Sequence, residues 1–472
     1  MNRDALCYES TVSLARRIRA GEVSPLQAVH AYLDRIERVD PRVHSYLHVA
    51  ADRAVLAARR AEQALVEGRD LGALHGVPVA VKDLFDTAGI PTTCGSPRIL
   101  GGNVPARTAT AVERLEQAGA VLLGKLHMTE FAFIAHHPDT RPAQNPWATD
   151  RSPGGSSSGS AVAAACGLAS ATLGTDTAAS IRLPAAWCGA VGLKPTWGRV
   201  SRDGVFPLAA SFDHVGPITR SVADAALVLH CIAGPDPRDP STRRQGAPPA
   251  EPAPRDDFKR VRIGWDEDFV TMGVMPDVVA AVRAARDRME ALGATIVPIE
   301  LPDLETMCTT FTSVFDVEMR AAHAGLYPER AADYGPLARH ALAHFATRDP
   351  LVHVEGAIEA RAFRHRIDRL FDEIDVLLCP VSSITAPPQV DDETIIAIFA
   401  DDHRNIIRLT RLTSFWDLAG TPAISLAWGF DGDGLPLAVQ LVTRVGTDEA
   451  LLSIAARLEV EAPDRGRHPP LE

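Results

Sequence analysis

The sequence predicts an α/β fold, in which helices cover a β-sheet. Two groups of elements carry this prediction. In the first, a β-type run is followed by a helix and a second strand, over 77–81, 109–118 and 120–124. After a proline-rich stretch the same kinds of element return, over 260–265, 276–292 and 295–297. Strands that alternate with helices are typical of sheets with helical layers on their faces.

The composition is that of a soluble globular protein. The 472 residues are 46% hydrophobic and 23% charged, and the formal charge of −12 argues against a general basic surface for nucleic acid. We find no apolar run of about 18 residues, which excludes a membrane span, and residues 1–4 do not open a signal peptide. The seven cysteines are scattered and form no CxxC motif or Cys/His cluster. We therefore expect neither a disulfide framework nor a zinc site. We therefore expect a cytoplasmic protein.

The elements follow in chain order. Ser24 opens a capping box with Pro25 at the first helical position, and apolar residues recur at helical spacing up to Ile36. We expect an Ala/Arg-rich helix to continue over 37–67. Further along, the patterns predict a strand ending at Lys82, a loop-rich stretch over 145–160, a helix start at 161–165 and a strand within 169–174.

Seven prolines between residues 234 and 255 predict a loop or seam. Residues 304–375 are mainly helical in pattern, and further strands are predicted over 375–380, 422–426 and 436–442, with a last helix over 448–460. We interpret 1–472 as a single domain. Its parts are an N-terminal helical part over 1–70, a core segment over 71–233 that carries the chemistry, a proline-rich loop over 234–256 and a helical cap over the site at 304–375.

The chain has 48 lysines and arginines, but only four are lysines: Lys82, Lys125, Lys194 and Lys259. A codon or proteome bias accounts for this scarcity. It matters because arginine cannot lose its proton near neutral pH, whereas a buried lysine can act as a base. Lys82 ends an apolar strand, so burial is expected there.

Two Gly/Ser-rich stretches carry the chemistry. Residues 153–160 could form a flexible linker, a phosphate loop or a nucleophile elbow. A phosphate loop is disfavoured because no Gly-Lys-Ser/Thr ends this stretch. A nucleophile elbow is disfavoured because no hydrophobic strand precedes it. Small residues before Ser180, within 174–186, would let consecutive amides point at one oxygen, although a structural turn explains them equally.

Together these stretches resemble the amidase signature family. The blocks stand in family order at 76–83, 124–131, 145–147, 153–160, 174–186, 192–201, 213–217, 417–422 and 434–442. The resemblance covers nearly the whole chain and weakens over about 235–375. It implies the amidase signature fold, with a mixed β-sheet core covered on both faces by α-helices.

The resemblance also implies a catalytic triad, with Ser180 as the nucleophile, Ser156 as the bridging serine and Lys82 as the base. A cis peptide bond between Gly155 and Ser156 is expected. The backbone N–H groups of Thr177, Ala178, Ala179 and Ser180 would form the oxyanion hole. Chemically, a buried neutral lysine can take a serine proton through a second hydroxyl.

Residues around the triad are assigned more loosely. Ser157, Asp176 and Arg182 are expected to support the triad through hydrogen bonds, and His136 and His137 could contact substrate or be ordinary loop histidines. Many family members have Gly-Gly where this chain has Ala178-Ala179. The two methyl groups narrow the acyl pocket, and a positive φ would become costly there.

The leading hypothesis is a stand-alone amidohydrolase that converts a carboxamide, or a related acyl C–N compound, to a carboxylate and ammonia or amine. It needs no metal or organic cofactor. We expect it to bind a small-molecule amide substrate and neither nucleic acid nor a membrane. A homodimer is compatible with the sequence. The alternatives are the glutaminase (A) subunit of a tRNA-dependent amidotransferase, which the Ala-Ala pair and a short stretch over 131–145 disfavour, and a catalytically silent scaffold.

Overall fold

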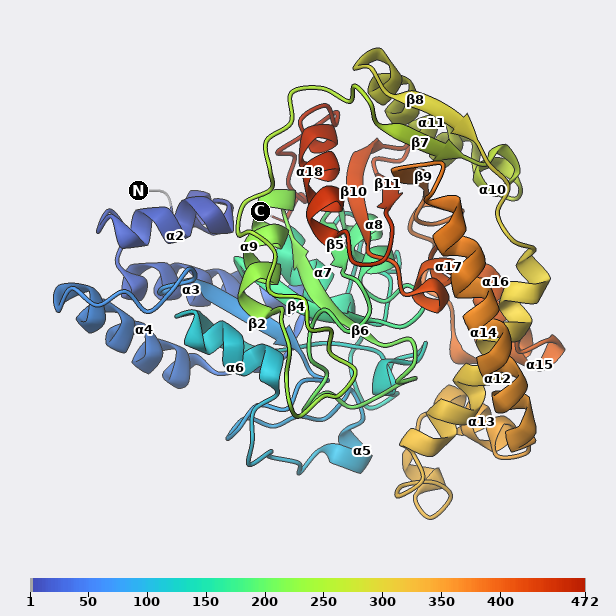
Figure 1. The fold of residues 1–472 in the computed structure, drawn as a ribbon. Helices are drawn as coiled ribbons and strands as arrows, with labels where there is room; N and C mark the ends of the chain where they lie inside the picture. Colours follow the sequence, from blue (N-terminus) through green and yellow to red (C-terminus); the bar gives the residue numbers. More distant parts are fainter. Residues whose placement is uncertain (1–2, 472) are drawn as a thin grey trace.

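A computed structural model describes residues 3–471. Their strands form one mixed sheet in the order β1-β3-β2-β4-β6-β5-β10-β11-β9-β7-β8 (Figure 1). The strands span Tyr46–Val49 (β1), Pro78–Lys82 (β2), Val121–Leu126 (β3), Ala171–Asp176 (β4), Val191–Lys194 (β5), His214–Thr219 (β6), Arg262–Trp265 (β7), Thr295–Pro298 (β8), Val376–Pro380 (β9), Ala423–Phe430 (β10) and Pro436–Val442 (β11). The predicted α/β class and mixed sheet are confirmed.

The sheet has parallel pairs near both ends and an antiparallel middle. β3, β2 and β4 are parallel neighbours, as are β9, β7 and β8. The strands between these groups pair antiparallel. The carboxyl ends of β2 and β4 therefore lie side by side at one edge of the sheet, which places Lys82 next to the end of β4.

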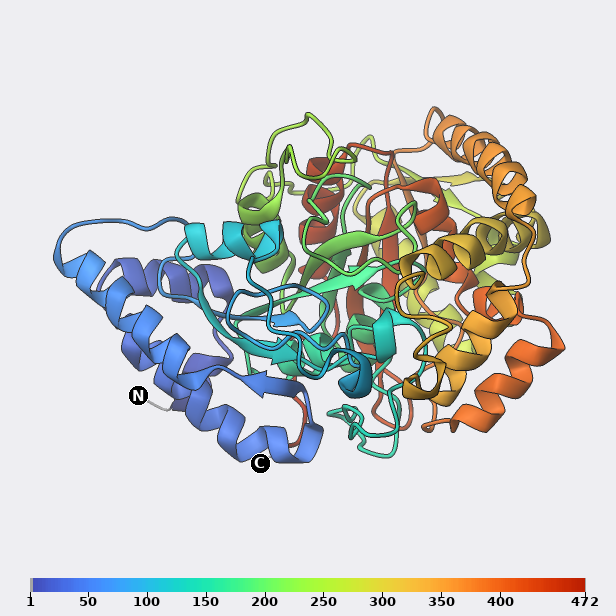
Figure 2. The ribbon, with the colours of Figure 1, turned by 90° about the horizontal axis from the view of Figure 1, so that it is seen from below.

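Helices cover both faces of the sheet (Figure 2). They span Arg3–Cys7 (α1), Thr11–Arg19 (α2), Pro25–Val43 (α3), Ala51–Val66 (α4), Pro97–Leu100 (α5), Thr110–Gln117 (α6), Ser158–Ala165 (α7), Arg182–Cys188 (α8), Val222–Ile232 (α9), Glu267–Thr271 (α10), Pro276–Ala291 (α11), Leu304–Ala322 (α12), Pro336–Phe345 (α13), Pro350–Leu370 (α14), Asp392–Asp401 (α15), Asn405–Leu409 (α16), Arg411–Ala419 (α17) and Asp448–Glu459 (α18), with short 3₁₀ turns at Glu130–Ala132 and Ala331–Asp333.

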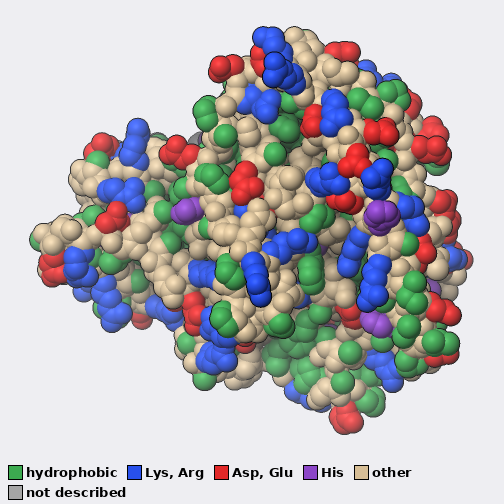
Figure 3. Space-filling model, viewed as in Figure 1, with side chains coloured by type: hydrophobic (Ala, Val, Ile, Leu, Met, Phe, Trp, Pro, Cys, Tyr) green, Lys and Arg blue, Asp and Glu red, His purple; other side chains and the backbone are tan. Residues whose placement is uncertain are grey.

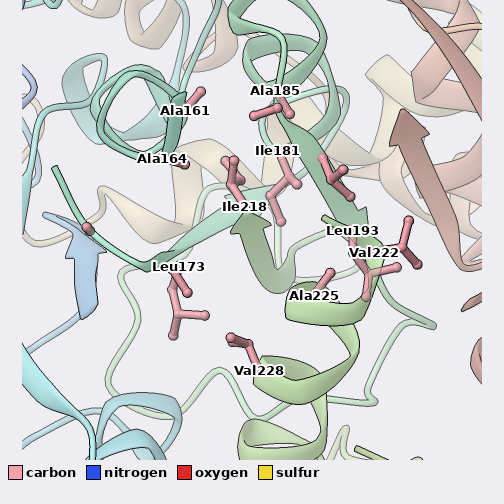
Figure 4. Close-up of a cluster of buried hydrophobic side chains, with 14 of the residues drawn as sticks. Ala161, Ala164, Leu173, Ile181, Ala185, Leu193, Ile218, Val222, Ala225 and Val228 are labelled. Atoms are coloured by element: carbon pink, nitrogen blue, oxygen red, sulfur yellow. The ribbon is translucent and has the colours of Figure 1, made fainter. Parts of the chain in front are cut away.

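The main core lies between the central strands and the helices on either side of them. Figure 4 shows Ala161 and Ala164 of α7 on one side of the strands and Val222, Ala225 and Val228 of α9 on the other. Alanines on α7 let this helix pack closely on β4, because no larger side chain separates the two backbones. α7 is buried along its whole length, so the residues before its first turn are held firmly over the sheet.

The predicted continuous helix over 37–67 is wrong. α3 ends at Val43, β1 follows as an edge strand paired with β3, and α4 begins at Ala51. Pro41 lies in the last turn of α3, and His44 adopts a left-handed conformation with φ 50°. The Asp40 carboxylate accepts hydrogen bonds from the main-chain N–H and the hydroxyl of Ser45, which ends the helix and starts the strand.

β5 and β6 were not predicted as strands, although both lie in blocks on which the resemblance rests. They are short and contain Gly192, Gly216 and Pro217, which are unfavourable for strands in isolation. A Cβ on Gly216 would lie 2.1 Å from the Leu193 carbonyl oxygen, so the glycine permits a close approach of the two backbones.

The proline-rich stretch connects α9 to β7 without a helix or strand. It runs past α18 toward the β7–β8 end of the sheet (Figure 1). The Ser453 hydroxyl and the Arg457 guanidinium of α18 donate to the carbonyls of Ala253 and Asp256, both at 2.8 Å.

A second core lies beneath α12–α17. It is rich in aromatic side chains, and Phe363 and Phe415 pack edge to face with ring centroids 5.5 Å apart. Several of its side chains, among them Phe315, Phe345 and Phe399, also border a cavity of about 560 Å³.

Charged side chains of both signs are spread over the face seen in Figure 3. Among residues 3–471, no helix combines the length and apolar character needed to cross a bilayer. Lys82, Lys125 and Lys194 are fully buried, whereas 78% of the Lys259 side chain is exposed.

Candidate active site

The structure brings Lys82, Ser156 and Ser180 to one edge of the sheet. Lys82 is the last residue of β2, Ser156 lies just before α7, and Ser180 lies in the turn that joins β4 to α8. Ser180 is 9% exposed and borders a cavity of about 560 Å³, while Lys82 and Ser156 are buried. The Gly155–Ser156 peptide bond is cis.

The Lys82 ammonium group contacts hydroxyls. Its Nζ lies 2.7 Å from Ser156 Oγ and 2.8 Å from Thr175 Oγ1. Burial lowers the pKa of Lys82 to about 7, although the negative charges of Asp176 and Asp213 oppose the shift. A large share of Lys82 is therefore neutral near pH 7, and a neutral amine can accept a proton from a hydroxyl.

Ser157 joins the loop before α7 to the turn that carries Ser180. Its hydroxyl donates to the Thr175 carbonyl at 3.2 Å, and its main-chain N–H donates to the Ser180 carbonyl at 3.2 Å. A Cβ on Gly174 would lie 2.7 Å from the Ser157 hydroxyl oxygen. The small residue at 174 therefore makes room for the hydroxyl that holds the two loops together.

The turn over 177–180 presents free amide groups. Among the residues that the structure describes, none accepts a hydrogen bond from the main-chain N–H groups of this turn. Neither Ala178 nor Ala179 has a positive φ, so the alanines cause no left-handed strain. The Thr177 hydroxyl donates to Asp213 at 2.6 Å, which holds one end of the turn in place.

A buried ion pair holds the other end of the turn. Asp176 accepts hydrogen bonds from the main-chain N–H of Ile181 at 3.1 Å and from Arg182 Nε at 2.9 Å. Burial by itself would raise the pKa of Asp176, but the Arg182 charge brings it below its usual value. Arg182 also pairs with Asp417 and donates to the Gln440 side chain at 2.9 Å, so α8 is fixed to α17 and β11.

The two adjacent histidines differ in position. His136 borders the cavity, and its Nε2 lies 3.2 Å from the Ser158 hydroxyl. Burial lowers the pKa of His136 to about 3, so its ring is neutral at ordinary pH. His137 is not among the residues that border the cavity, and its Nε2 contacts the Asp333 carbonyl at 3.2 Å. Of the pair, only His136 is placed to contact a ligand.

The cavity in front of Ser180 has a volume of about 560 Å³ and mostly apolar walls. α12 and α13 contribute Phe315 and Phe345, which belong to the predicted cap. Much of the remaining wall comes from residues 382–410, which include Phe399 of α15. This second segment was not predicted to border the site. Its apolar residues at 395, 398, 399, 406 and 407 could have indicated that it contributes a wall.

The other two buried lysines have structural partners. Lys125 Nζ forms an ion pair with Asp83 Oδ1 at 3.0 Å and donates to Thr92. Asp83 therefore points away from Lys82, as the alternation of side chains along a strand predicts. Lys194 donates to the Thr421 carbonyl and lies 3.3 Å from His214 Nε2.

Comparisons with known proteins identify the family of this chain. A family model described as Amidase matches residues 27–452. The chain is 39% identical to the A subunit of the glutamyl-tRNA(Gln) amidotransferase of Prochlorococcus marinus, over 96% of this chain and 97% of the relative. It is 37% identical to the putative amidase AmiD of Mycobacterium bovis, over 100% of this chain and 98% of the relative.

A solved structure extends the comparison. Peptide amidase from Stenotrophomonas maltophilia superposes with a TM-score of 0.83 and 29% identity, covering 98% of this chain and 99% of the other. The family model and the relatives each cover most of the chain, which therefore belongs to the amidase family.

Proposed function

We propose that this protein is a stand-alone amidohydrolase that cleaves a carboxamide, or a related acyl C–N bond, through an acyl-enzyme on Ser180. One observation carries the proposal. The Lys82 amine, with its lowered pKa, lies 2.7 Å from Ser156 Oγ behind the wall of the cavity that contains Ser180. This is the arrangement that a base needs in order to activate a serine through a second hydroxyl.

Acylation would proceed by one attack and one proton relay. Ser180 Oγ attacks the amide carbon while its proton passes to Ser156 Oγ, and the Ser156 proton passes to Lys82 Nζ. The carbonyl oxygen gains negative charge and accepts hydrogen bonds from the free N–H groups of the turn over 177–180. The relay then returns a proton to the nitrogen, the C–N bond breaks, and ammonia or an amine leaves.

Deacylation would use the same groups with water as the nucleophile. Water attacks the ester carbon, its proton passes along the relay, and the carboxylate product leaves as the Ser180 hydroxyl is restored. Because Lys82 is about half neutral near pH 7, it can accept the proton in one half-reaction and donate it in the other.

The cavity favours amides that carry a bulky apolar group. Four phenylalanines and six isoleucines are among the residues that border it, and none of the described residues that border it is a lysine or arginine. A free amino acid such as glutamine would place its α-carboxylate in a cavity without such a cation. This disfavours a glutaminase, although several relatives and one solved structure are named as A subunits of glutamyl-tRNA(Gln) amidotransferases.

The test is a panel of aliphatic, aromatic and ureido amides, together with glutamine, assayed for ammonia and amine. We expect turnover of apolar amides, and a drop of about 10³-fold or more in kcat for Ser180→Ala and Ser156→Ala. Ser160→Ala is the matched control, because Ser160 is a buried serine that bonds the Leu173 carbonyl outside the cavity.

Three results would overturn the proposal. Full activity in Ser180→Ala would remove Ser180 as the nucleophile. Ammonia release from glutamine that depends on a co-purifying partner protein would favour the amidotransferase assignment. A purified, folded protein without activity on any amide of the panel would favour the catalytically silent scaffold.

A further inference from the structure

A second polar cluster lies in the wall of the cavity, outside the proposed triad. It contains Asp316 of α12, His344 of α13 and His403, which lies between α15 and α16. One side-chain ligand atom from each residue lies within 4.8 Å of the other two. Asp316 Oδ2 and His403 Nε2 are 3.3 Å apart.

One member of this cluster has a polar atom without a partner. His344 Nε2 is buried and has no hydrogen-bond or ion-pair partner among the described residues, whereas Asp316 Oδ2 pairs with Arg348 Nε at 3.1 Å and with His403 Nε2 at 3.3 Å. The Asp316 side chain is only 1% exposed, and the His344 and Phe399 rings pack edge to face with centroids 5.5 Å apart. Buried polar atoms are nearly always bonded, so the His344 nitrogen leaves a place for a ligand in this cluster.

We propose that Asp316, His344 and His403 bind a divalent transition-metal ion of the zinc class. One carboxylate oxygen and two imidazole nitrogens are ligands that this class of ion prefers, and three protein ligands leave a fourth position open. Asp316 and His403 border the cavity that contains Ser180, so an ion bound to them would lie at the wall of this cavity. The ion would add a point of attachment for a donor atom of a bound molecule.

The Asp402 carboxylate lies near His403 without bonding it. The distance from His403 Nδ1 to Asp402 Oδ1 is 3.8 Å, and Asp402 accepts hydrogen bonds from Arg404 and Arg408 instead. His340 lies four residues before His344 on α13, so both project from the same face of the helix.

Arg348 competes with the ion. Its Nε lies 3.1 Å from Asp316 Oδ2, and a guanidinium at that distance opposes a second positive charge. The Arg348 side chain is 25% exposed and can turn toward solvent when a metal takes its place. Removing its charge should therefore strengthen metal binding, whereas removing a histidine should weaken it.

The experiment measures metal binding directly, on the full chain without a histidine tag. Zn²⁺ affinity is measured by calorimetry, and Co²⁺ is used as a spectroscopic probe because tetrahedral sites absorb visible light strongly. We expect one Zn²⁺ per chain, and a loss of about 100-fold or more in affinity for His403→Ala and His344→Ala. His365→Ala is the control, since His365 is exposed on α14.

Two further variants keep the result decisive. Arg348→Gln should bind Zn²⁺ more tightly than the wild type, an outcome that misfolding cannot produce. Ser180→Ala should bind Zn²⁺ as the wild type does, so this proposal stands or falls separately from the amidohydrolase. The proposal is overturned if the wild type binds no stoichiometric Zn²⁺, or if His403→Ala and His365→Ala bind it equally.

Discussion

Lys82 sets the pH range in which the proposed hydrolase works, because only its neutral form can accept the proton of Ser156. With a pKa of about 7, the neutral fraction is about 9% at pH 6 and about 91% at pH 8. The value of kcat/KM should therefore rise about tenfold between pH 6 and pH 8, and by only about 1.1-fold between pH 8 and pH 10.

An unperturbed lysine gives a very different profile. With a pKa of 10.5, the neutral fraction would increase about 100-fold from pH 6 to pH 8 and about 80-fold more from pH 8 to pH 10. The assay is initial-rate hydrolysis of an uncharged amide from the panel, with an enzyme-free blank at each pH. A rate that keeps climbing steeply above pH 8 would refute the argument that burial sets this pKa.

Three further predictions concern stability and positioning. The folded pKa of Lys82 lies below its unfolded value of 10.5, so the folded state binds fewer protons and its stability rises with pH. The unfolding free energy of the wild type relative to Lys82→Met should increase by about 2 kcal/mol from pH 7 to pH 9, and a pH-independent difference in urea titrations would contradict this. Thr177→Val should lower kcat more than it changes KM, with recovery in Thr177→Ser, because only a hydroxyl can bond Asp213; equal kinetics in both variants would argue against a positioning role. Asp176→Asn leaves the buried Arg182 charge less well paired and should destabilise the fold by about 3 kcal/mol, which thermal unfolding would detect as a lower Tm.

The residues of the proposed triad could be selected from the sequence because they lie in short blocks whose spacing is distinctive. The physical state of Lys82 could not, since its pKa depends on burial by residues from distant parts of the chain. The hydrogen bond from the Thr177 hydroxyl to Asp213 could not be predicted either, because the two residues are 36 positions apart. An extended apolar strand indicates burial but does not identify the groups that surround its last side chain.

The errors in the predicted fold have local causes. The helix over 37–67 was predicted from composition, but Pro41 lacks the main-chain N–H that a continuing helix needs, and the Asp40 carboxylate bonds the main chain of Ser45 beyond the helix end. β5 and β6 were not predicted because glycine has a low strand propensity. In this fold their glycines allow neighbouring backbones to approach closely. The Asp316–His344–His403 cluster has no sequence signal, since its members come from three separate elements and share no ligand spacing.

Burial alone does not distinguish Lys82 from the other buried lysines; the partner of each amine does. Lys125 lies 3.0 Å from the Asp83 carboxylate, an ion pair that a guanidinium could also form. Lys194 donates to the Thr421 carbonyl and lies 3.3 Å from His214 Nε2, and neither group borders the cavity that contains Ser180. Lys82 contacts the hydroxyl of Ser156, whose neighbour Ser157 bonds the Ser180 carbonyl, so of these three amines only this one adjoins the Ser180 turn through a hydroxyl. We therefore expect Lys82→Arg to lose hydrolysis even when it folds, because arginine keeps its proton, while Lys125→Arg retains most of it. Activity in a folded Lys82→Arg variant would show that the positive charge, rather than a removable proton, is what this position supplies.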